Sequence, residues 1–152
     1  MENHRKAVTT ISVQVQPNRW TCLPVSFAML IGVPHQKILE KLKYEGGPRD
    51  FHIQEIIDLL FVLGYSTTCI EAFPCFMFDS ELWSEEKAEA RLKEYLDNNC
   101  GVIVGVVNGH RHAAAWDGHQ VYDPNGTIYG LGDHEWAIRY FYIAKNGKES
   151  SR

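Results

Sequence analysis

Long apolar runs are missing from this sequence of 152 residues. No stretch approaches the ~18 apolar residues that a membrane-spanning helix requires. Residues 1–7 are polar and charged, and no apolar segment of a signal peptide follows them. Internal repeats and low-complexity segments are missing too. We therefore expect one cytoplasmic domain over residues 1–152, with flexible tails over 1–8 and 146–152.

An excess of positive charge is also missing. The 15 Lys and Arg residues are outnumbered by 19 Asp and Glu residues, which gives a formal net charge of -4. A surface of that sign does not attract nucleic acid or anionic membranes. We therefore expect neither of these as a partner, and nothing in the sequence indicates an oligomeric state.

Closely spaced cysteines are the third absence. Cys22, Cys69, Cys75 and Cys100 form no C-x-x-C pair, which argues against a structural zinc site and against a redox dithiol. In a cytoplasmic protein disulfides are not expected either. Cys69 and Cys100 each lie at or beside an expected strand, so we interpret both as small buried apolar side chains.

Hydrophobic periodicity predicts helices in the first part of the chain and strands in the last. We expect helices that begin at Leu23, Pro34, Asp50 and Ser84 and end before Gly32, Gly46, Gly64 and Gly101. We expect strands over 11–16, 65–72, 102–107, 111–116, 119–123, 127–131 and 136–144. This order predicts an α+β fold with an antiparallel sheet. The aromatic segment 73–83 fits neither period and is expected to be a loop over the core or a wall of a cleft.

One loop carries a cysteine to the start of the first helix. Residues 16–22 end where the apolar run 23–31 begins, and Pro24 suits the first helical turn. The free N–H groups and the positive end of a helix stabilise a thiolate, the nucleophilic form of cysteine. Cys22 is therefore a candidate nucleophile on a central, buried helix.

A later hairpin supplies a candidate base. Asp117-Gly118 between two extended runs predicts a two-residue turn, which fixes the pairing of the strands on either side. The expected pairs are Trp116 with His119, Ala115 with Gln120, Ala114 with Val121, Ala113 with Tyr122 and His112 with Asp123. Directly opposed side chains lie ~5 Å apart, so the hairpin places a carboxylate beside an imidazole. The three alanines leave room for a helix to pack closely against this strand.

These residues supply the parts of a thiol-dependent catalytic site. Cys22 is the nucleophile, His112 the base, and Asp123 the group that orients the imidazole. Gln16 adds an amide donor for the oxyanion that forms when a carbonyl is attacked. The sequence alone does not show that the hairpin reaches Cys22, and an isolated His112–Asp123 pair is also typical of a solvated surface.

The layout resembles papain-like cysteine peptidases. A glutamine lies six positions before a cysteine that opens a buried helix, and a late histidine is followed by a strand, a turn, a strand and Asp123-Pro124. The similarity is greatest to the compact bacterial or phage branch, the bacteriocin-leader-type and transglutaminase-like cysteine peptidases, and it spans residues 15–126. The resemblance implies a papain-like fold, with the nucleophile helix packed against a C-terminal antiparallel sheet. It also implies a cofactor-free peptidase or amidase that cleaves a protein or peptide substrate through an acyl thioester.

Two departures from that family pattern leave alternatives open. Many relatives have Gly or Trp after the nucleophile, whereas Leu23 and Pro24 follow Cys22, so the backbone part of the oxyanion hole is not defined. In addition, His110 lies on the same face of the strand as His112 and is expected opposite Asn125. A set of Cys22, His110 and Asn125 is therefore a second candidate for the catalytic group.

Other classes of function also fit some of these residues. His110, His112 and Asp123 are types of residue that bind zinc or iron, which would make this a metal-binding protein. A non-catalytic binding or inhibitory protein on the same fold would use Trp20 and the segment 73–83 as contacts. Among enzymes, the layout also serves amidases and acyltransferases, in which water or an amine accepts the acyl group.

Overall fold

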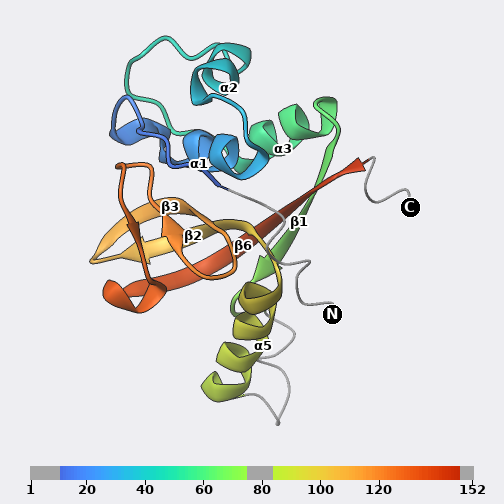
Figure 1. Cartoon of the computed structure of the whole chain (residues 1–152), viewed down its shortest axis with the longest axis vertical. Coiled ribbons are helices and arrows are strands. Elements are labelled where there is room, and N and C mark those ends of the chain that lie inside the picture. The colour runs from blue at the N-terminus through green and yellow to red at the C-terminus, as the bar shows by residue number, and fades with distance from the viewer. Residues whose placement is uncertain (1–10, 75–83, 148–152) are drawn as a thin grey trace.

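The computed structural model describes residues 11–74 and 84–147 and contains helices on both faces of one sheet (Figure 1). The described helices are α1 (Cys22–Ile31), α2 (His35–Lys41), α3 (Ile53–Val62) and α5 (Glu85–Asn98), with short 3-10 turns η2 (Arg19–Thr21) and η3 (Leu131–Asp133). Helices α1 to α3 gather on one side of the sheet and α5 lies on the other (Figure 1). Within the described ranges, none of these helices has the length and apolar character needed to cross a membrane.

Within residues 11–74 and 84–147 the sheet has six strands in the order β1-β6-β2-β3-β4-β5, and every neighbouring pair is antiparallel. The strands are β1 (Tyr65–Glu71), β2 (Gly101–Val107), β3 (His110–Trp116), β4 (Val121–Tyr122), β5 (Ile128–Tyr129) and β6 (Trp136–Asn146). The predicted α+β class is confirmed. Most of the predicted loop over 73–83 lies outside the described residues, as do Cys75, the N-terminal tail over 1–8, and residues 148–152 of the C-terminal tail.

Helix α1 forms the centre of the molecule because almost all of its sides are apolar. Val25, Phe27 and Ala28 are fully buried, and Met29 is 1% exposed. The helix ends at Gly32, as predicted. Its φ of 76° suits glycine, and its N–H donates to the carbonyls of the last turn. Because α1 is buried, the side chain of its first residue, Cys22, is held in a fixed position.

The start of α3 differs from the prediction that Asp50 caps it. The cap is His52, whose Nδ1 accepts a hydrogen bond from the N–H of Gln54 (3.0 Å). The Glu55 carboxylate accepts one from the N–H of His52 (2.9 Å), which completes a reciprocal capping box. This box moves the helix start beyond Asp50 and leaves that carboxylate exposed in the preceding loop.

The predicted strand over 11–16 is also wrong. Its only ladder contact in the described chain is an isolated bridge between Val15 and Asn125. The side chain of Gln14 instead bonds to the turn between α1 and α2, donating to Val33 O (2.8 Å) and accepting from the N–H of His35 (2.7 Å). These bonds to a helix corner replace the pairing that a strand would need.

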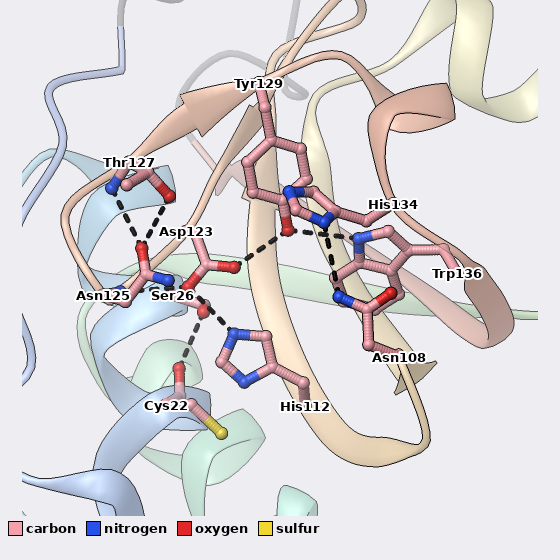
Figure 2. Close-up of polar contacts among 10 residues, drawn as sticks. All are labelled: Cys22, Ser26, Asn108, His112, Asp123, Asn125, Thr127, Tyr129, His134 and Trp136. Atoms are coloured by element: carbon pink, nitrogen blue, oxygen red, sulfur yellow. Dashed lines mark hydrogen bonds and ion pairs between the residues drawn. The ribbon is translucent and has the colours of Figure 1, made fainter.

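The three alanines of β3 lie where the helices approach the sheet, as expected. Ala113 and Ala115 belong to the apolar cluster that contains the buried face of α1. Ala114 points to the opposite face, into the cluster that contains Leu96 of α5. Small side chains on both faces let α1 approach β3 closely, which brings the first turn of α1 toward His112 (Figure 2).

The turn predicted at Asp117-Gly118 is wrong in length. Ala115 pairs with Tyr122, not Gln120, so residues 117–120 form a four-residue loop. The reason is the Asp117 carboxylate, which accepts hydrogen bonds at 2.7 Å from the N–H groups of both His119 and Gln120.

A two-residue turn does exist one hairpin earlier. Asn108 and Gly109, with φ of 51° and 85°, join β2 to β3 and leave Val107 paired with His110. Regular strand pairing therefore begins at His110.

The prediction that Cys69 is buried is wrong as well. Cys69 is exposed on β1, which is an edge strand of the sheet, so one face of β1 is open to solvent. Cys100, just before β2, is partly buried.

Gly105 is required where β2 meets β6. The register of that pair shifts between Val104 and Gly105, and a Cβ added at Gly105 would lie 2.2 Å from the carbonyl oxygen of Ala137. Gly105 is also the residue of β2 that pairs with His112. The bulge therefore lies directly beside the strand position of the imidazole.

We predict that Gly105→Ala destabilises the fold by about 1–3 kcal/mol, because the new methyl group clashes with main-chain atoms that cannot rotate away. The free energy of unfolding in urea measures this. Gly132→Ala is the matched control, since nothing lies within 4 Å of a Cβ there. Equal stability of the two variants would contradict the steric role of Gly105.

Candidate active site

Cys22 is the first residue of α1, and the preceding turn fixes its direction. The Asn18 side chain caps η2 by accepting from the N–H of Trp20 (3.0 Å), and the hydroxyl of Thr21 donates to the Asn18 carbonyl (3.0 Å). Thr21 therefore holds the turn before the helix. The Ser26 hydroxyl donates to the Cys22 carbonyl (2.7 Å), one turn further along.

His112 lies between Cys22 and Asp123. Its Nε2 is 2.9 Å from Asp123 Oδ1, and its side chain is only 18% exposed. The Cys22 sulfur lies on the other side of the ring, toward the second ring nitrogen (Figure 2). The three predicted residues are therefore brought together in the order thiol, imidazole, carboxylate.

The His112–Asp123 contact forms although the predicted register was wrong. The shift from Gln120 to Tyr122 as the partner of Ala115 is a shift of two residues. Side chains in a strand alternate with a period of two, so Asp123 keeps its face. The carboxylate then meets the imidazole diagonally rather than directly across the ladder.

Asp123 is a buried carboxylate with donors on both oxygens. It is 3% exposed. Oδ1 accepts from His112 and from the N–H of Asn125 (3.0 Å), and Oδ2 accepts from the hydroxyl of Tyr129 (2.9 Å). Burial alone would raise the pKa of Asp123, but these donors and the charge of His112 lower it below its ordinary value. The group is therefore an anion at neutral pH, and it holds the proton on Nε2 of His112.

Tyr129 and Trp136 extend the site, and sequence reasoning missed both. The Trp136 indole N–H donates to the Tyr129 hydroxyl (3.2 Å), which in turn donates to Asp123. The Trp136 ring centroid lies 6.0 Å from that of His112 (Figure 2). The Asp123-Pro-Asn-Gly turn gave a signal for Tyr129, because such a turn returns the next strand to the carboxylate. No local pattern marks Trp136.

The charge state of His112 follows from its surroundings. Burial lowers its pKa, but hydrogen bonds to Asp123 and Cys22, together with the charges of both, raise it to about 9. His112 is thus protonated at neutral pH. An imidazolium beside a cysteine stabilises the thiolate form of that cysteine.

Gln16 lies near this group through its backbone. Its N–H donates to the Pro124 carbonyl (2.7 Å), next to the Val15–Asn125 bridge. The loop that leads to Cys22 is therefore tied to the turn that carries Asp123. The side-chain Oε1 of Gln16 is buried and has no hydrogen-bond partner among the described residues.

His112 separates two hollows. One is a cleft of about 360 Å³ that Cys22 and His112 both line, and we call it the thiol cleft. The other residues that line it come from three parts of the chain: Arg19, Trp20 and Leu23 around the start of α1, Asp50 and Phe51 before α3, and Val104, Gly105, Arg111 and Ala113 on β2 and β3. The second hollow, of about 470 Å³, is lined by His112 and Asp123 together with other polar residues.

The alternative set of Cys22, His110 and Asn125 is not brought together. His110 and Asn125 line the second hollow and not the thiol cleft. The Asn125 side chain is engaged by Thr127, whose N–H and hydroxyl both donate to its Oδ1. The metal alternative finds no support either. Among the described residues, no three His, Cys, Asp or Glu side chains are grouped closely enough to hold an ion.

Comparison with known proteins adds no identification. No protein-family model matches the chain, and neither the curated proteins nor the solved structures contain a significant match.

We predict that His112 titrates with a pKa of about 9, and that Asp123→Asn lowers this pKa because a negative charge is lost. Its folded pKa lies above the ordinary 6.5, so its contribution to stability is complete below pH 6.5 and is lost as pH rises through about 9. Two-dimensional NMR of the imidazole signals measures this. His35 is an internal reference, since burial shifts its pKa in the opposite direction. A midpoint for His112 at or below 6.5 would contradict the paired site.

We predict that Tyr129→Phe costs about 1–3 kcal/mol of folding free energy, because a buried carboxylate oxygen loses its donor. The pKa of Asp123 should rise for the same reason. Urea unfolding and NMR titration of the carboxyl group test the two effects. Tyr140→Phe, at a ring that is 39% exposed, is the control and should change neither quantity.

Proposed function

We propose that this protein is a thiol-dependent hydrolase, a cysteine peptidase or amidase that cleaves a protein or peptide substrate. The proposal depends on one observation: the Asp123 carboxylate holds the His112 imidazole 2.9 Å away, while the opposite side of that ring faces the Cys22 sulfur (Figure 2). A nucleophile, a base and an orienting acid in this order are the elements of nucleophilic acyl transfer.

The first step forms the acyl thioester. The Cys22 thiolate attacks the carbonyl carbon of the substrate, a carbon–sulfur bond forms, and the carbonyl electron pair moves to oxygen. When that pair returns, the carbon–nitrogen bond breaks, and His112 gives its proton to the departing amine. A raised pKa in His112 supports this role, because the proton needed by the leaving group is already present.

The second step releases the acyl group. Neutral His112 now takes a proton from water as the oxygen of that water attacks the thioester carbon. The carbon–sulfur bond breaks, and the acid product leaves. Cys22 departs as a thiolate beside a protonated His112, so the starting state returns. An amine in place of water would give acyl transfer through the same steps.

A papain-like fold accounts for the arrangement of these parts. The chain supplies the cysteine at the start of a buried helix, then the histidine on a strand, then the aspartate after the next turn. Helix α1 packs on β3, the strand that carries His112. We assign the oxyanion donor to the amide of Gln16, in agreement with the resemblance. Its main-chain N–H donates to the Pro124 carbonyl, which holds Gln16 beside the turn that follows Asp123.

We predict that iodoacetamide labels Cys22 well before Cys69, Cys75 and Cys100 at pH 6, because only a thiolate reacts and Cys22 has the His112 imidazolium beside it. Intact-mass and peptide mass spectrometry measure the rates. Cys22→Ala should abolish the fast adduct, and His112→Ala should slow it at least 100-fold. His110→Ala, on the same strand but outside the thiol cleft, is the control and should leave the rate unchanged.

Two outcomes would contradict the proposal. Equal, slow labelling of all four cysteines would leave a binding protein as the better reading. Fast labelling that survives His112→Ala but not His110→Ala would move the base to His110. Release of amine from a peptide library, absent in Cys22→Ala, then separates an enzyme from a protein that only has a reactive thiol.

A further inference from the structure

The charged side chains of the thiol cleft have the opposite balance from the whole chain. Apart from the Cys22–His112 pair, the ionisable residues that line the cleft are Arg19, Arg111 and Asp50. Two positive charges thus face one negative charge, in a protein whose formal charge is -4. The site is therefore a local positive region on an acidic molecule, and it attracts anions.

Both arginines are available to a ligand. Arg19 and Arg111 are exposed, and neither forms an ion pair with a carboxylate in the described part of the chain. Arg49, in the loop between α2 and α3, is different. It pairs with Glu55 and donates to the Leu42 carbonyl, so its charge is used within the fold.

The two arginines come from different parts of the chain that line the thiol cleft. Arg111 is the residue of β3 just before His112, and it shares a face of the strand with Ala113, which also lines the cleft. Arg19 belongs to η2, and its guanidinium stacks 4.6 Å above the Trp20 ring. A stacked guanidinium loses little additional freedom when it binds a carboxylate.

The η2 segment that carries Arg19 is also held by side-chain hydrogen bonds. Asn18 accepts from the N–H of Trp20 and donates to the Tyr44 hydroxyl (2.8 Å). The Tyr44 ring centroid lies 5.3 Å from that of Phe51, which also lines the thiol cleft. Through Tyr44, Asn18 therefore links the segment that carries Arg19 to the segment that carries Phe51, which favours a defined site over a diffuse attraction.

We propose that Arg19 and Arg111 bind a carboxylate on the acyl part of the substrate, which identifies the substrate class as peptides with an acidic residue close to the cleaved bond. The inference rests on the proposed function. Guanidinium groups recognise carboxylates through paired, charge-assisted hydrogen bonds. The acyl part is the one concerned because it stays on Cys22 within this cleft, whereas the amine departs past His112. Asp50 opposes the binding and limits it to one anionic group.

Matched peptides test the proposal. Acetylated tetrapeptide coumarin amides carry Glu or Gln at each of the three positions before the cleaved bond. We expect kcat/KM to be at least tenfold higher for Glu at one position, and this ratio should fall in 1 M NaCl. A peptide with a γ-linked glutamate distinguishes a side-chain carboxylate from a main-chain one.

Four variants assign the effect to residues. Arg19→Gln and Arg111→Gln should each reduce the Glu/Gln ratio at least threefold, and Asp50→Asn should increase it. Arg139→Gln removes the same charge from an exposed site on β6, outside the thiol cleft, and should leave the ratio unchanged. An equal fall of the ratio in Arg139→Gln would show a general charge effect and overturn the proposal.

Equilibrium binding separates this inference from the proposed function. Calorimetry with Cys22→Ala measures the affinity for the same Glu and Gln peptides without any chemistry. Suppose that the Glu peptide binds more tightly, that this preference depends on Arg19 and Arg111, and that the wild-type protein cleaves no peptide. The anion site would then be supported, and the proposed catalytic function would be contradicted. Cleavage of the Glu and Gln peptides at equal rates would support the catalytic function and contradict the anion site.

Discussion

The buried carboxylate of Asp123 is the group on which the rest of the site depends. A carboxylate that is 3% exposed is tolerable only when its oxygens receive hydrogen bonds. Three donors meet this need: the His112 ring, the N–H of Asn125 and the Tyr129 hydroxyl. Two of the donors belong to the turn and strand that follow Asp123, so the carboxylate is held by neighbouring chain as well as by His112. The Asp123 carboxylate that holds His112 is shielded from water, so water does not compete for this hydrogen bond.

The same turn also sets the position of the thiol. The N–H of Asp123 donates a hydrogen bond to the Thr127 carbonyl, and the N–H of Gly126 closes the turn by donating to the Asp123 carbonyl. The Gln16 N–H donates to the carbonyl of Pro124, so the loop before Cys22 is attached to this turn. The cysteine and the histidine, 90 residues apart in the chain, are therefore both located relative to one short segment. A displacement of that segment would disturb both of them together.

Features with a local cause could be predicted from the sequence, and those with a distant cause could not. Gly32 ends α1 and Ser84 caps α5, because each acts on its own neighbouring main chain. The strand expected around Gln14 failed because its hydrogen-bond partners lie at a helix corner about 20 residues away. Trp136 escaped notice for the same reason: its indole reaches Asp123 only through Tyr129, and no spacing in the sequence encodes such a chain.

The His112–Asp123 pair shows which errors in strand register still leave a predicted contact correct. The turn at Asp117 was assigned the wrong length because its carboxylate binds two main-chain N–H groups and opens the loop. That error moved the register by two residues, and side chains two apart share a face. An error of one residue would have sent Asp123 to the opposite face of the sheet from His112. The contact needs only that both side chains lie on the same face and that the carboxylate is within diagonal reach of the imidazole. The alternation of side chains therefore predicts this pair more reliably than the length of the turn does.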